Sequence, residues 1–502
     1  MSKVLLGIDI GTSSCKTALF NEEGKLLSSA SSAYLVYYPK AGYAQQDPVD
    51  WWKAVCRSTK EVLDKSGVNA GDIIGIGVDG QSWSAIPLDR QGDVLCPTPI
   101  WMDTRAEEIC ARLREQIGEE VLFEVSGNPL KPSYTMPKVL WYKEESPEIY
   151  NKTDKILQSN SYIVYRLTGK ITQDLSQGYG WSCFNMREGK WDRELCRELG
   201  IEDSFLPEIH PCHQVVGNVS RKAAQETGLC EGTPVVAGAL DAACATLGAG
   251  VVKPGQTQEQ GGQAGGMSIC MDSYKADRNL ILGFHASSDR WLLQGGTVGG
   301  AGVMKWFEKE FAAEERMQSD SFEALNDLAK KIPPGSEGVV FLPYMAGERT
   351  PIWDPYAKGV FYGLDFSKSR GHFLRAAMEG VAFSLRHNIE TAEAAGACVD
   401  VLRAVGGAAN SALWMQIKAD ITGKAICVPS SDTATTLGAV LLAGVGVRLY
   451  KDFEDAVGRT IRDRAYYEPD PKNREIYDRN YEIYRELYES LKKLMRRSGK
   501  EE

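Results

Sequence analysis

The chain alternates short apolar runs, most of which end in a glycine-rich turn, with longer segments whose apolar residues recur at helical spacing. The short runs have the length of strands, and the spacing of the longer segments is typical of helices packed on one face. In the first half these patterns predict strands at 3–10, 15–21, 73–78 and 234–238, and helices at 49–66, 104–117, 136–147 and 222–228. This mixture predicts an α/β fold.

The second half shows the same alternation of short apolar runs, glycine turns and helical spacing. It predicts strands at 279–285, 290–294 and 402–405, helices at 371–396, 410–422 and 435–446, and a glycine turn at 295–300 that leads into a helix containing Trp306. The charged tail from about residue 471 predicts a solvated amphipathic helix with apolar positions Ile476, Tyr481, Tyr484, Leu487 and Leu491. Because each half begins with a β-hairpin, we expect two related α/β domains, 1–248 and 249–502, that face a central cleft.

The composition is that of an ordinary globular enzyme, with 43% hydrophobic and 25% charged residues among 502. The formal net charge of −10 argues against a general nucleic-acid-binding protein, which needs a basic field. No signal segment or long apolar run is evident, so we expect a cytoplasmic protein without membrane contact.

The 12 cysteines are scattered without a C-x-x-C motif, which is typical of reduced, buried thiols in a cytoplasmic protein. The segment His210-Pro-Cys-His213 has a spacing that fits no standard zinc site, so we interpret it as a surface loop.

The first chemical candidate is the turn that follows the strand ending near Asp9. Gly11 allows backbone N–H groups to approach an anion, Thr12, Ser13 and Ser14 add hydroxyl donors, and Lys16 adds positive charge. Asp9 is placed to hold Mg²⁺ through water. The turn is suited to a nucleotide phosphate tail, although a stable hairpin is the alternative interpretation.

Asp241 is the candidate general base. It comes just after the strand predicted at 234–238 and opens a helix of small residues, where the helix dipole favours the carboxylate. A positioned carboxylate can accept the proton of a sugar hydroxyl as a phosphoryl group arrives. A plain N-cap aspartate is the alternative.

Three later glycine turns, 261–266, 295–297 and 406–410, could present backbone amides to phosphate or lie flat against adenine, or could simply be tight turns. By contrast, the G-x-G-x-x-G match at 75–80 lies inside a predicted strand and continues as extended chain. It therefore fails the context of a dinucleotide-binding fingerprint.

A polar and aromatic group suggests a sugar pocket, because aromatic faces stack on sugars while amides and carboxylates bind their hydroxyls. Core tryptophans with surface charges are the alternative interpretation. The group consists of Gln81, Ser82, Trp83, Trp101, Asp103 and Arg105.

In this order the motifs resemble the FGGY family of carbohydrate kinases, from about residue 3 to residue 450. The most specific segment is Gly359-Val-Phe-Tyr-Gly-Leu364, followed after seven residues by His372-Phe-Leu-Arg-Ala-Ala-Met-Glu-Gly380, which matches the family's C-terminal signature. The N-terminal signature lies near Lys138-Val-Leu-Trp141. The resemblance implies two actin-like (ribonuclease H-like) ATPase domains. The first would bind the sugar and carry the first phosphate turn, and the second would bind adenosine and carry the helical tail.

The resemblance also implies roles for individual residues. Asp241 falls on the catalytic base, and Asp9 would help to place Mg²⁺. ATP would be bound by Gly11, Thr12, Ser13, Lys16, Gly262, Gln263, Gly299, Gly406, Gly407 and Asn410. The sugar would be bound by Gln81, Ser82, Trp83, Trp101, Asp103 and Asp241.

Two segments depart from the family pattern. The second phosphate turn usually reads Gly-Thr-Ser-Gly but here is Gly262-Gln-Ala-Gly265, which removes both hydroxyl donors. The substrate loop, Gly-Gln-Met-His-Gly in xylulokinases, is Gly80-Gln-Ser-Trp-Ser84.

We therefore expect an ATP- and Mg²⁺-dependent kinase that phosphorylates a terminal hydroxyl of a small sugar, first a ketopentose such as xylulose, and that could form a homodimer. The alternatives are a kinase for a polyol or for an aldonic acid such as gluconate, with Arg105 as the cation for its carboxylate, and a non-catalytic sugar or nucleotide sensor on the same scaffold. A polymerising or chaperone-type ATPase is disfavoured by the C-terminal signature.

Overall fold

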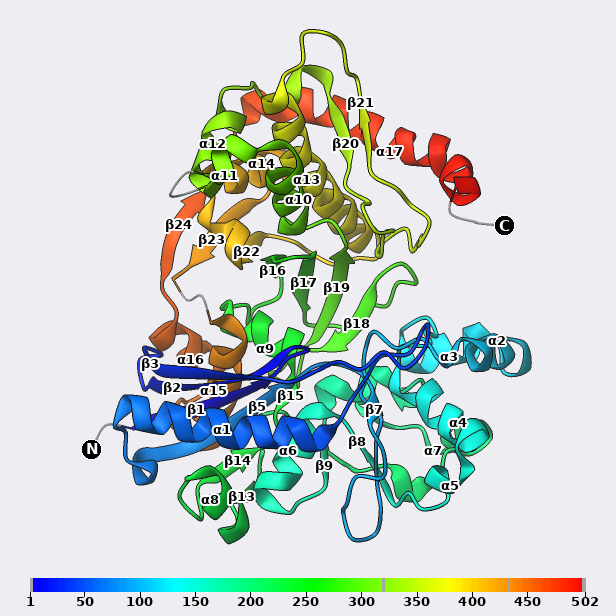
Figure 1. Ribbon diagram of the computed structural model, residues 1–502, viewed down its shortest axis with the longest axis vertical. Helices are drawn as coiled ribbons and strands as arrows, with labels where there is room; N and C mark the ends of the chain where they lie inside the picture. Colours follow the sequence, from blue (N-terminus) through cyan, green and yellow to red (C-terminus); the bar gives the residue numbers. More distant parts are fainter. Residues whose placement is uncertain (1–2, 318–320, 431–432, 499–502) are drawn as a thin grey trace.

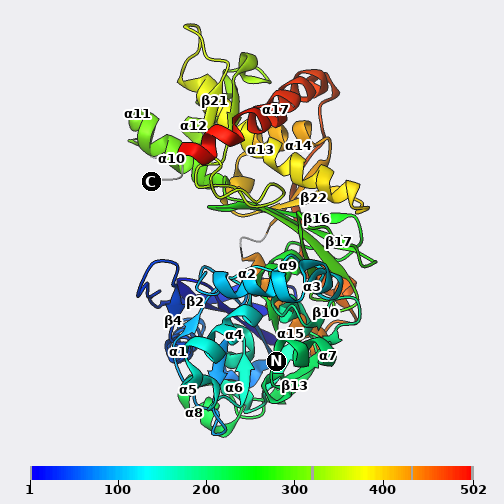
Figure 2. The same ribbon diagram turned by 90° about the vertical axis from the view of Figure 1, so that its right-hand side faces the viewer.

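Two lobes, each built on a seven-stranded mixed sheet, lie one above the other in this computed structural model, which describes residues 3–317, 321–430 and 433–498 (Figures 1 and 2). The first sheet has the order β13 (Val215–Asn218), β14 (Pro234–Val236), β5 (Ile73–Gly80), β1 (Val4–Ile10), β2 (Ser14–Asn21), β3 (Leu26–Ala33), with β15 (Ala239–Leu240) also paired to β5. The second has the order β18 (Ile281–Phe284), β19 (Trp291–Thr297), β17 (Gly265–Met271), β16 (Gln256–Gly261), β22 (Val401–Val405), β23 (Ala425–Pro429), β24 (Asp463–Tyr467).

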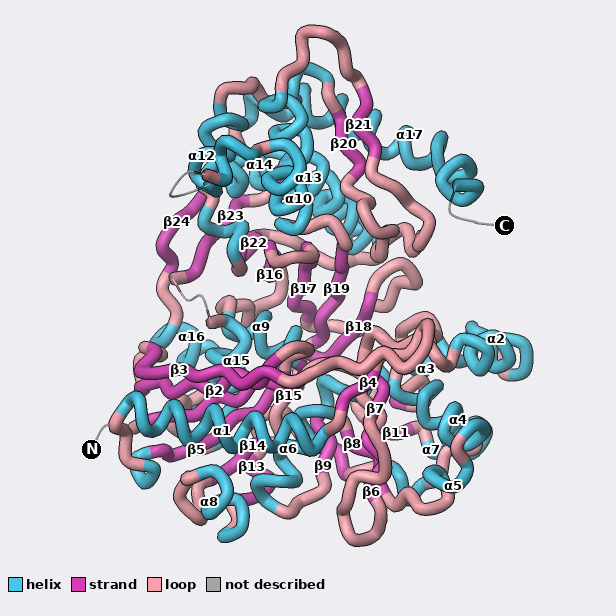
Figure 3. The backbone as a smooth tube through the Cα atoms, viewed as in Figure 1, coloured by secondary structure: helices cyan, strands magenta, loops and turns pink. Residues whose placement is uncertain are grey.

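The strands of the two sheets form two separate groups in Figure 3. Both sheets have the same arrangement of strands at their centre. In the first, the antiparallel hairpin β1–β2 lies beside the parallel strand β5. In the second, the antiparallel hairpin β16–β17 lies beside the parallel strand β22. The two lobes are therefore related α/β domains, as predicted.

Helix α1 (Pro48–Ser66) shows how local sequence sets one element. The Asp47 carboxylate accepts a hydrogen bond from the Val49 N–H, Pro48 occupies the first turn, and Gly67 ends the helix with φ of 65°. Its apolar side, which includes Trp51 and Val55, packs in one core with residues of β1. The helix covers one face of the first sheet, beside β2 and β3.

The opposite face is covered by α15 (Ala434–Gly446), which packs against α9 (Asp241–Gly248), β1 and β5. Backbones approach closely here: a Cβ on Gly77 would lie 1.8 Å from the Ala439 carbonyl oxygen, and one on Gly438 would lie 1.9 Å from that of Cys244. The next helix, α16 (Phe453–Thr460), also lies beside the first sheet in Figure 1. Helices α15 and α16 thus pack on the first lobe although they come late in the sequence, and the predicted division at 248/249 stays a prediction.

The second lobe is built around the long helix α13 (Arg370–Ala394), which lies against β17, β19 and β20 (Val340–Leu342). The tail helix α17 (Arg474–Ser498) packs on the same lobe, and the Tyr344 hydroxyl donates a 2.6 Å hydrogen bond to that of Tyr484. The predicted face is confirmed at Tyr481 and Tyr484. Ile476, Leu487 and Leu491 are partly buried against the same core, which confirms them as apolar positions of this face. The buried residues of the helix are Tyr477, Asn480, Tyr481, Tyr484, Tyr488 and Met495.

The other predicted strands and helices are present, with ends that shift by a few residues. One correction concerns 295–300, because Gly295 and Gly296 lie inside β19 and not in a turn. The remaining helices are α2 (Glu107–Gln116), α3 (Glu119–Ser126), α4 (Thr135–Glu145), α5 (Pro147–Tyr150), α6 (Ser159–Thr168), α7 (Arg193–Leu199), α8 (Arg221–Thr227), α10 (Ala301–Phe311), α11 (Ala313–Arg316), α12 (Ser321–Lys330) and α14 (Ala412–Thr422). The remaining strands form the pairs β4 (Gln45–Gln46) with β7 (Thr98–Pro99), β6 (Ile86–Leu88) with β8 (Lys155–Leu157), β9 (Thr172–Asp174) with β12 (Glu208–His210), β10 (Phe184–Asn185) with β11 (Lys190–Trp191), and β20 (Val340–Leu342) with β21 (Val360–Tyr362).

Candidate active site

A cavity of about 400 Å³ lies between the lobes and is lined by residues from both. Its first-lobe wall includes Thr12, Ser82, Trp83, Trp101, Tyr179 and Asp241. Its second-lobe wall includes the turn 262–265, parts of β16, β17 and β19, and Arg349. The structure thus brings the predicted base, part of the predicted sugar group and two predicted phosphate turns to one cavity.

The turn between β1 and β2 is held from several sides. The Gly11 N–H donates to the Ser14 carbonyl, and the Tyr34 hydroxyl donates to the Gly11 carbonyl. The Trp101 Nε1–H donates a 3.0 Å hydrogen bond to the Thr12 hydroxyl, which fixes that hydroxyl at the cavity wall. Ser13 is exposed at the tip.

Asp9 lies between two charged residues of neighbouring strands. It pairs in register with Lys16 of β2 on one side and with Asp79 of β5 on the other. Burial raises the pKa of Asp9, while Asp79 and Lys16 lower it in part. A carboxylate in this position has a nearby positive charge but still faces a second acid.

Asp79 is a residue that the sequence analysis missed. It is fully buried, and neither carboxylate oxygen has a hydrogen-bond partner among the described residues. Burial and the charges of Asp9 and Asp241 raise its pKa well above the usual value for aspartate. The match to G-x-G-x-x-G at 75–80 lies inside β5, as predicted. An acidic residue near the end of this apolar strand, Asp79, was the signal that could have identified the position.

Asp241 is placed by the parallel pairing of β15 with β5, which carries the chain past Asp79 and Gly80 before α9 begins. Its carboxylate accepts a 2.6 Å hydrogen bond from the Ala242 N–H and faces the cavity. Burial, followed by the charge of Asp9, raises the pKa of Asp241 to about 7. A group with this pKa can hold or release a proton near neutral pH, as a general base must.

The turn 262–265 adjoins the start of α10. The carbonyls of Gly262 and Gln263 accept hydrogen bonds from the N–H groups of Ala301 and Gly302, at 2.8 and 3.0 Å. Turn and helix are in close contact, since a Cβ on Gly302 would lie 2.2 Å from Nε2 of Gln263. The turn is therefore shaped by backbone contacts, although it lacks side-chain hydroxyls.

Gly299 lies beside this turn but packs against Pro343. A Cβ on Gly299 would lie 2.4 Å from the Pro343 carbonyl oxygen, and Gly299 is not among the residues that line the cavity. Its predicted contact with the nucleotide stays a prediction.

The turn 406–410 follows β22 and touches the turn 262–265. Gly406 has φ of 90°, and a Cβ there would lie 2.9 Å from the Gly261 carbonyl oxygen. Gly407 has open space beside its Cα, whereas the Asn410 side-chain oxygen accepts a 2.5 Å hydrogen bond from Arg464. The two turns therefore form one continuous glycine-rich surface in the second lobe.

Trp83 anchors the opposite end of the cavity. It has a left-handed backbone with φ of 59°, and its ring packs 4.6 Å from that of Tyr134 and 5.5 Å from that of Tyr179. The Lys138 ammonium donates hydrogen bonds to the carbonyls of Trp83 and Ile100. This aromatic cluster provides the apolar face that a sugar pocket needs. Tyr179 was missed, because nothing near it in the sequence marks it as a ligand residue.

Gln81 and Asp103 do not line the cavity. The Gln81 amide donates to the Gln46 side chain, and the Asp103 carboxylate accepts from the Ala44 N–H and from Arg105. These contacts place both residues behind the cavity wall, where they hold its loops. Their predicted contact with the substrate stays a prediction.

Arg105 is not the cation of the pocket, and this expectation is corrected. Its guanidinium is 2.8 Å from Asp103 and lies over the rings of Tyr43 and Trp141. Arg349 of the second lobe lines the cavity instead. It comes directly after Glu348, whose carboxylate accepts hydrogen bonds from Thr297 and from the backbone N–H groups of Val298 and Arg349 itself.

In residues 3–317, 321–430 and 433–498 no group of three or more histidine, cysteine or acidic side chains is arranged to hold a metal, and this includes the segment 210–213. Within the same ranges, every helix is too short or too polar to cross a bilayer.

Comparisons with known proteins agree with this geometry. The patterns of the FGGY family of carbohydrate kinases match residues 4–248 for the N-terminal domain and 273–447 for the C-terminal domain. A xylulose kinase of Bacillus subtilis is 33% identical over 98% of both chains. Crystal structures of a xylulose kinase and a gluconate kinase from Lactobacillus acidophilus superpose with TM-scores of 0.90 each, at 27% and 26% identity, over 97–98% of this chain and 98% of theirs. The chain therefore belongs to the FGGY family of carbohydrate kinases.

Proposed function

We propose that this carbohydrate kinase transfers the γ-phosphoryl group of ATP to a terminal hydroxyl of a ketopentose such as xylulose. One observation carries the proposal: Asp241, with a pKa of about 7 and a single backbone hydrogen bond, faces a cavity bounded by both phosphate turns and by an aromatic cluster. The similarity to xylulose kinases favours a ketopentose.

In this proposal Asp241 accepts the proton of the hydroxyl as its oxygen attacks the γ-phosphorus. The Thr12 hydroxyl and the amides of the turn 262–265 lie on opposite walls, where they can donate to the oxygens of the transferring group. Trp83 and Tyr179 present their rings to the carbon chain of the sugar. The enclosed position between two lobes limits the access of water, which would otherwise compete with the sugar.

Asp9 and Asp79 suit a divalent cation. Their carboxyl groups lie at the same register of adjacent strands, and burial with the charges of Asp9 and Asp241 raises the pKa of Asp79 well above its usual value. A divalent cation would favour the ionised form of both groups. Carboxylate oxygens are the ligands that Mg²⁺ prefers, and Asp9 would hold the ion directly or through water. When bound, Mg²⁺ neutralises the charge of the β- and γ-phosphates.

A coupled ADP-release assay over ketopentoses, ketohexoses, polyols and aldonates tests the proposal. We expect a ketopentose to give the highest kcat/KM, and Asp241→Asn to lower kcat about 10²–10⁴-fold, the usual contribution of a general base. The affinity of Asp241→Asn for a non-hydrolysable ATP analogue, measured by calorimetry, serves as the control for folding. A variant with near-normal sugar-dependent turnover would exclude Asp241 as the base, and the absence of sugar-stimulated turnover would refute the whole proposal.

A second candidate function, an aldonic acid kinase, is favoured by Arg349. Its guanidinium lies in the cavity wall, and its charge also acts on the adjacent Glu348 carboxyl, where it opposes the effect of burial on the pKa. Burial raises the pKa values of Tyr134 and Tyr179, and the charge of Arg349 lowers them in part. The pKa of Asp241 is instead raised by burial and by the charge of Asp9. Arg349 thus acts on the aromatic end of the cavity, where the substrate end remote from the transferred phosphoryl group would lie.

The variant Arg349→Gln separates the two candidates. If the substrate is an aldonate such as gluconate, we expect its kcat/KM to fall about 10–100-fold, which corresponds to one charge-assisted hydrogen bond of about 1.5–3 kcal/mol. Arg349→Lys, which keeps the charge, should retain part of the activity. If a neutral ketopentose is the substrate, all three proteins should turn it over within a few-fold of one another.

A further inference from the structure

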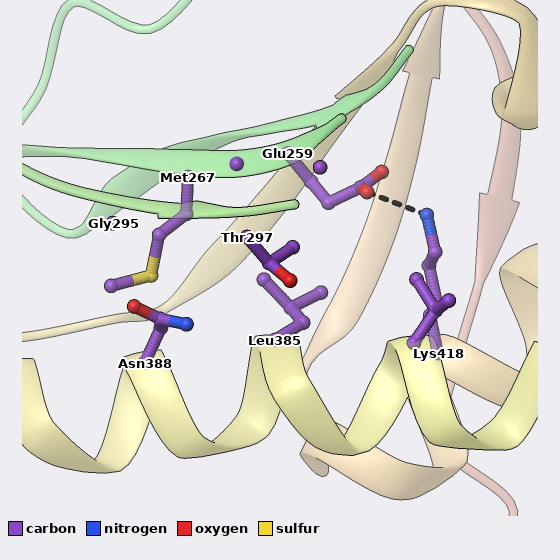
Figure 4. Close-up of a pocket in the computed structure, with 10 residues that line it drawn as sticks. Glu259, Met267, Gly295, Thr297, Leu385, Asn388 and Lys418 are labelled. Carbon is purple, nitrogen blue, oxygen red and sulfur yellow. Dashed lines mark hydrogen bonds and ion pairs between the residues drawn. The ribbon is translucent and has the colours of Figure 1, made fainter. Parts of the chain in front are cut away.

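A buried ion pair lies beneath the two glycine turns of the second lobe. The Lys418 ammonium of α14 is 2.5 Å from the Glu259 carboxylate of β16, and the side chains are 1% and 4% exposed. Figure 4 shows Lys418 reaching from its helix to Glu259, with the dashed line marking their contact. Neither residue lines the cavity between the lobes, so the pair has a role other than direct contact with a substrate.

The pair lies at the junction of both turns. Glu259 is two residues before Gly261, where the turn 262–265 begins, and the Lys418 Nζ is 3.6 Å from the place of a Cβ on Gly261. The same Cβ would lie 2.5 Å from that of Ala408 in the turn 406–410. A shift of Lys418 or Glu259 would therefore move β16 at the point where the two turns meet.

Helix α13 packs against β17 on this side of the hairpin, but the packing beside the ion pair is incomplete. A void of about 10 Å³, close to the space that one water molecule needs, lies under Gly265 and Gly266 and is bordered by Glu259 and Lys418. The second Glu259 oxygen has no partner among the described residues. Because the desolvation of two charges offsets much of their attraction, such a pair contributes little to stability compared with apolar residues of the same size. The pair instead fixes the position of α14 relative to β16.

We propose that Lys418 and Glu259 are positioning residues that set the turns 262–265 and 406–410 at the spacing required by ATP. The proposal rests on the proposed function, because it takes ATP as the ligand of these turns. The turn 262–265 lacks side-chain hydroxyls, so its backbone amides are what remain to be positioned for the phosphates. An ion pair beneath the turn fixes the position of those amides directly.

The test compares Lys418→Met with the double variant Lys418→Met/Glu259→Leu. The single variant leaves a buried carboxylate unpaired, so both its melting temperature and its ATP affinity should fall. The double variant should recover the melting temperature while its Kd for a non-hydrolysable ATP analogue stays about tenfold weaker, as expected for small displacements of binding groups. Its KM for the sugar should be unchanged. Lys424→Met, which breaks the partly exposed pair with Glu393, is the matched control and should bind the analogue normally.

Hydrogen exchange provides a readout that does not depend on ATP. In the double variant the amides of 261–266 and 406–409 should exchange faster than in the parent and in Lys424→Met. If the double variant does not fold, the same hydrogen-exchange measurement is made on Glu259→Gln, which keeps the shape of the side chain. Normal analogue binding with unchanged exchange in these segments would overturn the proposal. If the parent itself fails to bind the analogue while exchange responds as expected, the proposed function fails and the positioning role stands.

Discussion

The hairpins β1–β2 and β16–β17 occupy equivalent places in the two sheets but differ in chemistry. The first has Asp9 near its turn, with Asp79 beside it on the parallel strand and Asp241 beyond. The second has glutamine at 260 and 263 and glycine at 261, 262 and 265, with a further glycine turn on its parallel strand. One plan thus provides an acidic wall, suited to a cation and to proton transfer, and a wall of amides that is neutral apart from Arg349 and is suited to a nucleotide.

The difference shows how a duplicated fold can divide its functions. Parallel pairing places the end of β5 beside that of β1, and the end of β22 beside that of β16. The residues at these strand ends are therefore brought side by side, and Asp241 and the turn 262–265 line the cavity itself. Changing a few of them alters the chemistry of a wall without altering the sheet.

The largest effect is expected from weakening the acidic wall with Asp79→Asn. This change removes a buried carboxylate that has no donor among the described residues, so the free energy of unfolding without ligands should rise by about 1–3 kcal/mol. The gain in melting temperature on adding Mg²⁺ and ATP should shrink, since there is less repulsion for a cation to relieve. Thermal melts with and without these ligands measure both effects. A fall in stability without ligands would show that Asp79 is satisfied in the resting protein.

An effect of similar size is expected from Gly406→Ala in the neutral wall. A side chain at φ of 90° is strained, and its Cβ would lie 2.9 Å from the Gly261 carbonyl oxygen. We expect a loss of about 1–3 kcal/mol of stability and a higher KM for ATP, with the KM for the sugar unchanged. Gly458→Ala, in α16 with open space around it, is the control and should lower neither stability nor the affinity for ATP, since alanine favours a helix more than glycine does. Steady-state kinetics with each substrate varied in turn would expose a misassignment if the sugar KM changed instead.

The smallest effect is expected from making the second wall more like the first. The double variant Gln263→Thr/Ala264→Ser restores two hydroxyl donors to the turn 262–265. Because a neutral hydrogen bond contributes about 0.5–1.5 kcal/mol, the KM for ATP should fall by a few-fold with little change in kcat. An unchanged KM would indicate that the backbone amides of this turn already satisfy the phosphates.

Much of this molecule could be predicted from its sequence, because the patterns involved are local. Strand-length apolar runs, glycine turns and capping residues such as Asp47 are set by neighbours along the chain. The turn at Asp9, the strand through 75–80 and the placement of Asp241 at a helix start therefore emerged from periodicity and turn chemistry alone. The α/β class and the resemblance to carbohydrate kinases followed from the order of these motifs.

Tertiary structure alone decided which charged residues face one another. Arg105 and Arg349 look alike in the sequence, yet the first is neutralised by Asp103 while the second lines the cavity. Asp79 lies in a match to an unrelated motif, and pairing with β1 makes it a neighbour of Asp9. Packing likewise assigned 434–460 to the first lobe and joined Lys418 to Glu259 across 159 residues. Such contacts depend on strand register and helix docking between distant segments, which local patterns do not specify.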